Sequence, residues 1–182
     1  MARLFMVRHG RAAASFGESM DPGLDELGRE QARVTAKRLE EFGPLPIVSS
    51  PLKRAQETAA PLAQLWKCQP VIEDAVAEIP SSSHSLAERA QWLRGFMAGS
   101  WRDASPDLAQ WRENAVAALA ALGEDTVIFS HFIAINVAAG AALNDDRVVV
   151  FSPDNCSVTV FEAENGRLRL IEQGHEAQTK VN

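Results

Sequence analysis

The chain of 182 residues contains 46% hydrophobic and 23% charged residues, which is typical of a single globular domain over residues 1–182 and excludes a disordered protein. Its net charge of −6, without a run of lysines or arginines, argues against nucleic acid or an anionic membrane surface as the main partner. A small anionic ligand remains compatible with this charge, because a few arginines can form a local positive pocket.

The two cysteines, Cys68 and Cys156, form no CxxC or Cys/His cluster. This pattern predicts reduced thiols, without a disulfide framework or a structural zinc site. The N-terminus lacks the apolar segment and cleavage site of a signal peptide, and no stretch approaches the roughly 18 apolar residues of a membrane span. We therefore expect a cytoplasmic protein.

The first third of the chain predicts a strand, a long loop and a helix. Residues 3–7 are short and apolar and precede Gly10, which is typical of a buried parallel strand. After a loop of small and polar residues at 11–23, Asp25 can cap a helix. Apolar residues recur at roughly helical intervals after it, at Leu27, Val34, Leu39 and Phe42. Gly43-Pro44 then predicts the end of this helix.

Two serine-proline pairs indicate further helix starts. Residues 46–49 predict a strand, and Ser50-Pro51 after it has the composition of a cap followed by the first helical residue. This helix is expected to run to about Trp66, and residues 69–73 predict a third strand. Ser105-Pro106 repeats the signature and predicts another amphipathic helix.

The last third predicts a strand, a buried helix and a hairpin. β-Branched and apolar residues at 126–130 indicate the strand, and the almost wholly apolar segment 132–143 is too long for a strand and predicts the helix. Residues 157–162 and 167–172 alternate across Asn165-Gly166, which is typical of a β-hairpin.

Strands that alternate with helices predict an α/β fold with three layers, α/β/α, and a mostly parallel sheet that ends in an antiparallel C-terminal edge hairpin. Ligands of such sheets bind outside the carboxyl ends of the strands. The unusual residues that three predicted strands bring to this edge are Arg8-His9, Ser49-Ser50 with Arg54 just inside the next helix, and Ser130-His131. A cation in the first helical turn opposes the helix dipole by about 0.3–1 kcal/mol, and a bound anion would reverse this effect.

Each of these residues also has an ordinary explanation. Arg54 can be a solvated surface arginine, and His131 can be a hydrogen-bonded core histidine. Their convergence favours phosphoryl transfer through a histidine, because a neutral imidazole can attack phosphorus and guanidinium groups bind phosphate oxygens in pairs. This chemistry also needs a proton for the leaving group, best supplied by a buried carboxylic acid at the same edge.

Five sequence blocks occur in an order that extends over nearly the whole chain. They are FMVRHG at 5–10, LGREQA at 27–32, SSPLKRAQETA at 49–59, FSH at 129–131 and NCSVTV at 155–160. With these blocks the chain resembles the histidine phosphatase superfamily, which has the phosphoglycerate mutase-like fold. The first and third blocks are the specific ones.

The resemblance implies roles for four residues. His9 would be the nucleophile, Arg8 and Arg54 would clamp the phosphate, and His131 would be the second histidine that steadies the transferred group. No metal is expected, because His9 and His131 lack the carboxylate or thiol companions that a metal site needs.

The resemblance also implies an acid after the third strand. Glu78 is the natural candidate, with Glu73 and Asp74 as competitors. We interpret residues 75–105 as an insertion, with one helix near 86–97, that covers the site and sets the substrate. Candidate substrate contacts there, each also explicable as a surface charge or a core anchor, are Arg89, Arg94, Arg102, His84 and the tryptophans.

The chain departs from the family pattern at two places. After the RHG triplet many members have Glu or Gln and then Thr, followed by a polar residue that touches phosphate, whereas this chain has RAAAS at 11–15. Arg11 or Ser15 would have to replace that contact. The second histidine is usually followed by glycine, and Phe132 in its place would narrow the pocket or pack beneath it.

We therefore predict a metal-independent phosphatase, without a cofactor, that hydrolyses phosphomonoesters through a phosphohistidine at His9. A phosphoglycerate-type mutase is the nearer alternative, but mutases tend to be longer, with a tail that closes the site. A non-catalytic phosphate-binding module is the alternative from another class. The expected partner is a small phosphorylated substrate or a phosphoprotein, and neither nucleic acid nor a membrane.

Overall fold

The computed structural model describes residues 1–15, 17–81 and 85–177. A six-stranded sheet in the order β3-β2-β4-β1-β5-β6 forms its centre. The strands are β1 (Ala2–Arg8), β2 (Ile47–Ser49), β3 (Val71–Ile72), β4 (Thr126–Ser130), β5 (Val158–Glu164) and β6 (Arg167–Glu172). The first four pair in parallel, β5 pairs antiparallel with β1, and β6 pairs antiparallel with β5 at the edge of the sheet. The predicted α/β fold with an antiparallel C-terminal hairpin is therefore confirmed.

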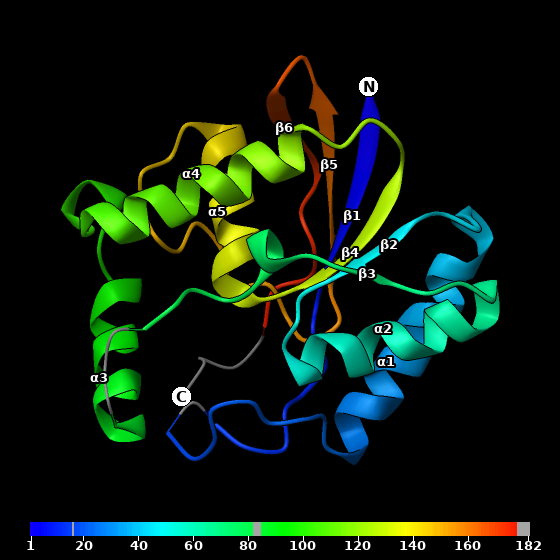
Figure 1. Cartoon of the computed structure of the whole chain (residues 1–182), viewed down its shortest axis with the longest axis horizontal. Helices are drawn as coiled ribbons and strands as arrows, with labels where there is room; N and C mark the ends of the chain where they lie inside the picture. The colour runs from blue at the N-terminus through cyan, green and yellow to red at the C-terminus, as the bar shows by residue number, and fades with distance from the viewer. Residues whose placement is uncertain (16, 82–84, 178–182) are drawn as a thin grey trace.

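Helices cover both faces of the sheet (Figure 1). α1 (Glu26–Leu39) and α2 (Lys53–Trp66) pack on one face, while α4 (Pro106–Ala120) and α5 (Phe132–Leu143) pack on the other. Beside α4 and α5 lies α3 (Leu86–Met97), at the lower left of Figure 1. The 3-10 turns are η1 (Glu40–Phe42), η2 (Asp74–Val76) and η3 (Trp101–Asp103). Among the described residues, no helix has the length and apolar character needed to cross a bilayer.

The strand β1 is buried on both faces. Leu4 and Met6 join the core beneath α4 and α5, whereas Phe5 and Val7 join the core beneath α1 and α2. Successive residues of a strand point to opposite faces, so an unbroken apolar run suits a strand that helices cover on both sides. Parallel pairing with β4 then places the carboxyl ends of β1 and β4 side by side.

The helix α2 begins later than the sequence predicts, at Lys53 instead of directly after Ser50. Ser50 does not cap the helix, because its Oγ accepts the N–H of Leu52 and contacts His131. The carboxylate of Asp21 accepts the N–H of Lys53 at 2.9 Å instead. A residue from the loop before α1, distant in the sequence, thus accepts the first N–H of α2.

The helix α1 begins at its predicted cap and buries a face of small residues. Asp25 accepts the N–H of Gly28 at 2.7 Å, and Leu39 is buried. The other apolar residues that predict the helix are exposed, and they are Leu27, Val34 and Phe42. The backbone of Arg11 passes so close to Gly28 that a Cβ there would lie 2.1 Å from the Arg11 carbonyl oxygen. Close backbone packing therefore decides which face of α1 is buried.

The segment 75–105 follows a third strand, Val71–Ile72, that is shorter than the predicted range of 69–73, and the side chain of Glu73 after it caps η2. Within the segment, α3 packs through Leu93 and η3 packs through Trp101 against α4 and α5. The organisation as one domain with an insertion that covers the site stays a prediction.

Candidate active site

Two neighbouring parallel strands carry the two histidines. His9 follows β1 and His131 follows β4, and the N–H of His9 donates to the carbonyl of Ser130 at 3.0 Å. The centroids of the two imidazole rings lie 5.2 Å apart, and both residues are buried. The sheet therefore joins two residues that are far apart in the sequence.

The contacts of His9 determine which of its ring nitrogens carries the hydrogen. Nδ1 lies 2.7 Å from the carbonyl oxygen of Gly10, which can only accept, so Nδ1 donates. Nε2 lies 3.1 Å from Nε of Arg54, which can only donate, so Nε2 accepts. Burial, followed by the positive charges of Arg54 and Arg8, lowers the pKa of His9 to about 3. The ring is therefore neutral at neutral pH, with its free lone pair on Nε2.

The backbone around His9 is held by two polar side chains. Thr58 donates its hydroxyl to the carbonyl of Arg54 at 2.6 Å and accepts the N–H of Gly10 at 3.0 Å. Asn155 donates from Nδ2 to the carbonyl of His9 at 3.0 Å. His9 and the arginine that contacts it are thus fixed through the same small network.

Arg8 contributes a second guanidinium group from the end of β1. Its Nη1 donates to the carbonyl of Pro153 at 2.8 Å, and its guanidinium carbon lies 5.2 Å from the ring centroid of Phe132. Its Nε is buried without a hydrogen-bond partner among the described residues. Phe132 therefore packs against the cation, a contact that stabilises by about 0.5–1 kcal/mol at exposed sites and more when desolvated.

Glu78 provides a buried carboxyl group. Its Oε1 accepts the N–H of Ile79 at 3.0 Å, and its Oε2 accepts the N–H of Ile133, near the start of α5, at 3.4 Å. Burial raises the pKa of Glu78, although these N–H groups and the charges of Arg54 and Arg8 oppose the shift. A carboxyl group that keeps its proton to higher pH is suited to general acid catalysis.

The two competing carboxylates lie on the surface. Glu73 and Asp74 are both exposed, and Oε1 of Glu73 accepts the N–H of Ala75 at 3.0 Å at the start of η2. Of the three candidates, Glu78 is therefore the one that lies beside the arginines of the site.

His131 is held by Ser50, which follows β2. Nε2 of His131 lies 2.7 Å from Oγ of Ser50, and neither residue has solvent-exposed surface. Burial lowers the pKa of His131 well below its ordinary value, and the neighbouring charges of Arg54 and Arg8 act in the same direction. The second histidine is therefore also neutral.

The sequence profile of the histidine phosphatase superfamily (branch 1) matches residues 4–175. The chain belongs to this superfamily. The family that the five sequence blocks predict is therefore confirmed.

Named members of the superfamily include phosphatases and mutases. A probable phosphoglycerate mutase of Photorhabdus laumondii is 26% identical over 162 residues, covering 79% of this chain and 75% of that protein. A glucosyl-3-phosphoglycerate phosphatase of Mycolicibacterium vanbaalenii is 47% identical over 64 residues, covering 33% of this chain and 28% of that protein.

Solved structures share the fold. The mycobacterial glucosyl-3-phosphoglycerate phosphatase superposes with a TM-score of 0.75 at 24% identity, covering 97% of this chain and 100% of that chain. Phosphoserine phosphatase from Entamoeba histolytica, in complex with 3-phosphoglyceric acid, has a TM-score of 0.76 at 23% identity, covering 98% of each chain. These likenesses confirm the predicted phosphoglycerate mutase-like fold.

The two residues predicted to replace the family's loop contact lie apart from this cluster. Arg11 is exposed and forms an ion pair with Asp25 at 2.5 Å. Ser15 donates its hydroxyl to Glu18 at 2.9 Å. Their roles in substrate binding stay predictions. In the part of the chain that the structure describes, no group of three or more side chains is arranged to hold a metal ion.

The candidate arginines of the insertion differ in their positions. Arg89 is buried on α3, and its charge reinforces the effect of burial in lowering the pKa of Arg54. Arg94 is exposed, and Arg102 forms an ion pair on the surface. His84 lies outside the described residues. Of the described candidates, Arg89 is therefore the arginine with an electrostatic connection to the site.

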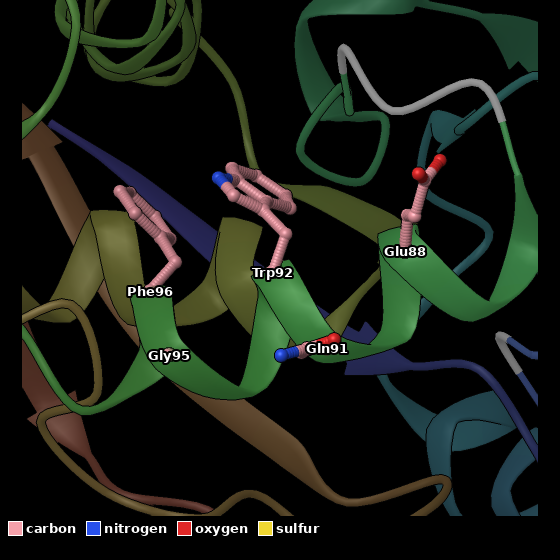
Figure 2. A pocket seen from close by; sticks show the side chains of 5 residues that line it. All are labelled: Glu88, Gln91, Trp92, Gly95 and Phe96. Atoms are coloured by element: carbon pink, nitrogen blue, oxygen red, sulfur yellow. The ribbon is translucent and has the colours of Figure 1, made fainter.

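The tryptophans of the insertion contribute to packing. Trp92 stacks on Phe96 with ring centroids 5.3 Å apart, and both rings project from the same side of α3 (Figure 2). The shallow hollow at this place is lined by Glu88, Gln91, Trp92, Gly95 and Phe96. Trp101 is buried, with the ring of Trp111 6.1 Å away. None of the catalytic candidates lines this hollow.

Three polar residues of the site received no catalytic role from the sequence. Ser50 stands before a proline in the sequence, as a helix cap does, so the sequence pattern gave no reason to expect its contact with His131. Thr58 is one helical turn after Arg54, so a shared helix face could be inferred from the spacing. Nothing in the sequence pattern connects Asn155 with His9, because their contact depends on how the loop before β5 packs.

Proposed function

We propose that this protein is a metal-independent phosphatase that hydrolyses phosphomonoesters through a phosphohistidine at His9. The observation that supports this function best is the neutral, single-tautomer state of the nucleophile. Its Nδ1 hydrogen is held by Gly10, and its Nε2 lone pair faces Arg54. An imidazole in this state can attack phosphorus without first losing a proton.

The reaction proceeds in two displacements. The phosphate dianion binds to Arg8 and Arg54, and the Nε–H of Arg54 then donates its hydrogen bond to a phosphoryl oxygen instead of to Nε2 of His9. Nε2 of His9 then forms a bond to phosphorus while the bond to the ester oxygen breaks, and Glu78 donates its proton to the leaving alkoxide. The Glu78 carboxylate next takes a proton from water as the water oxygen attacks. The phosphorus–nitrogen bond breaks, and inorganic phosphate and neutral His9 are released.

The substrate is a small phosphorylated metabolite that also carries a carboxylate. The names of relatives support this class, because phosphoglycerate, glucosyl-3-phosphoglycerate and phosphoserine all combine a phosphate with a carboxyl group. Buried Arg89, whose charge acts on Arg54, is suited to bind the second negative group. A phosphoprotein substrate and a cytoplasmic location, both expected from the sequence, stay predictions.

Phosphoglycerate mutase is the second candidate function, and the relative of that name favours it. Both reactions form the same phosphohistidine, and they differ in whether water or a second hydroxyl group accepts the phosphoryl group. Incubation with a phosphoglycerate separates them. A phosphatase releases inorganic phosphate, whereas a mutase yields the isomeric phosphoglycerate.

Hydrolysis of p-nitrophenyl phosphate in the presence of EDTA tests the proposed function. We expect the chelator to leave the wild type active and His9→Ala to abolish turnover, while a variant of the exposed His175, His175→Ala, stays active. The labelled phosphoryl group of a substrate should be trapped on His9 of the wild type as an acid-labile, alkali-stable adduct. Chelator-sensitive turnover that persists in His9→Ala would contradict the proposal.

A further inference from the structure

Ser50 and His131 form a buried hydrogen-bonded pair at the ends of β2 and β4. Oγ of Ser50 lies 2.7 Å from Nε2 of His131. The pair is rigidly placed, because β2 and β4 are neighbours and the N–H of Ser50 donates to the carbonyl of Phe129 at 3.0 Å. The position of the Ser50 hydroxyl is therefore set by the sheet.

A second contact favours one direction of the hydrogen bond between Ser50 and His131. The N–H of Leu52 donates to Oγ of Ser50 at 3.2 Å, so the oxygen is an acceptor there. Among the described contacts, Nε2 of His131 is the remaining acceptor for the single hydroxyl hydrogen of Ser50. If Ser50 donates to Nε2, this nitrogen must hold a lone pair.

The other ring nitrogen of His131 then carries the hydrogen. The ring is neutral, because burial lowers the pKa of His131 well below its ordinary value. Nδ1 is buried and has no hydrogen-bond partner among the described residues. A buried donor without a partner is destabilising. The ring of His131 lies 5.2 Å from that of His9, so a phosphoryl group bound at His9 would provide an acceptor for the Nδ1 hydrogen.

We propose that Ser50 is a positioning residue that holds His131 in the Nδ1–H tautomer, so that Nδ1 donates a hydrogen bond to the transferring phosphoryl group. This inference rests on the proposed phosphohistidine function. In the other tautomer Nδ1 would turn a lone pair toward the phosphoryl oxygens, and repulsion would replace the hydrogen bond. Ser50 thus controls the contact between His131 and the phosphoryl group without touching substrate.

Nitrogen NMR spectra of isotopically labelled protein report the tautomer. Ligand-free wild type should show a protonated Nδ1 and an unprotonated Nε2 for His131, with His131→Gln identifying the signals. Ser50→Ala should shift the hydrogen toward Nε2, whereas Ser50→Thr retains a hydroxyl and should keep the wild-type tautomer. Ser157→Ala removes a different buried hydroxyl and serves as the control.

The same variants are then compared in turnover of an aryl phosphate. We expect Ser50→Ala to lower kcat/KM by roughly 10- to 100-fold, as is typical when the residue that orients a functional histidine is lost. A hydrogen on Nε2 in the wild type, or an unchanged tautomer in Ser50→Ala, overturns the role of Ser50. The wild-type spectrum decides even if Ser50→Ala does not fold. The tautomer is measured without turnover, so the two proposals can fail separately. A wild type that does not hydrolyse phosphate esters would contradict the proposed function, whereas the NMR result alone tests the role of Ser50.

Discussion

Nε of Arg54 lies 3.1 Å from Nε2 of His9 and donates its hydrogen to the lone pair that would attack phosphorus in the proposed reaction. The contact joins the loop after β1 to the first turn of α2. The positive charge of Arg54 also helps to keep His9 unprotonated, because it lowers the pKa of that residue. In the proposed mechanism, Arg54 would therefore prepare the nucleophile as well as bind phosphate.

Replacing Arg54 by lysine separates these two tasks, because Arg54→Lys keeps the positive charge but removes the planar guanidinium group. We expect kcat/KM for p-nitrophenyl phosphate to fall by roughly 10²- to 10³-fold, the range seen when one donor to a transition-state charge is lost. Lys53→Arg, an exposed exchange on the neighbouring residue, is the control and should be near wild type. An Arg54→Lys variant with more than about a tenth of wild-type kcat/KM would contradict the need for this donor geometry.

The buried state of His9 predicts a pH-dependent stability. The pKa of His9 is lowered from 6.5 to about 3 in the folded protein, so between these values the unfolded chain binds a proton that the folded protein does not. The free energy of unfolding should therefore fall as the pH falls through this interval, by up to about 1.4 kcal/mol per pH unit from this residue.

Urea unfolding at several pH values, without phosphate, measures this dependence. His9→Gln cannot take up the proton, so its stability should fall less steeply with decreasing pH than that of the wild type. Unfolding free energies that fall in parallel for the two proteins would show that His9 is not the group responsible.

Much of the fold could be predicted because local patterns and tertiary structure agree. The apolar segment 132–143 is a fully buried helix over most of its length, and the residues around Asn165-Gly166 form the predicted hairpin turn. The start of α2 could not be predicted, because Ser50 and Pro51 have the composition of a helix start while the Ser50 hydroxyl is used by His131. Local propensity does not reveal such a tertiary contact.

The candidate site was predictable where it depends on strand order. Arg8 ends β1, His9 follows it and His131 follows the adjacent parallel strand β4, so the topology alone brings them together. The partner of Arg11 was not predictable in this way, because several polar groups lie within reach of an exposed side chain. In the structure Arg11 forms an ion pair with the cap residue Asp25. Competition among nearby polar groups determines such ion pairs, and the periodicity of the sequence does not report it.

The raised pKa of Glu78 predicts a leaving-group effect. Glu78→Gln cannot donate the proton, so hydrolysis of alkyl phosphates, whose alkoxides leave poorly, should fall by about 10²- to 10⁴-fold. Turnover of p-nitrophenyl phosphate should fall much less, since its phenolate leaves without protonation. Glu73→Gln, on the exposed competitor, should behave as wild type with both substrates. Equal losses of Glu78→Gln with both substrates would contradict a role as general acid.

The contact between Phe132 and Arg8 predicts an effect on phosphate affinity. Phe132→Leu keeps an apolar side chain but removes the ring under the guanidinium group, so inhibition by inorganic phosphate should weaken by about 2- to 5-fold. Phe161→Leu, in the core beneath α4 and α5, is the matched control for lost packing. If both variants weaken phosphate inhibition to the same degree, the effect belongs to general destabilisation and not to Arg8.

The position of Arg89 predicts a substrate-dependent effect. Arg89→Met removes the charge of a buried arginine that acts electrostatically on Arg54, while keeping a long apolar side chain. A charge-assisted hydrogen bond contributes about 1.5–3 kcal/mol, so kcat/KM for phosphate esters that carry a carboxylate should fall by about 10-fold or more.

The control for this prediction lies on the same helix. Arg94 is exposed on α3, and Arg94→Met should leave kcat/KM unchanged for every substrate. For p-nitrophenyl phosphate, which has no second negative group, Arg89→Met should also remain close to wild type. A comparison of 3-phosphoglycerate with p-nitrophenyl phosphate in the three proteins therefore isolates the contact with the carboxylate. Equal losses on both substrates would show that Arg89 acts through the shape or charge of the phosphate site and not through recognition of a second anionic group.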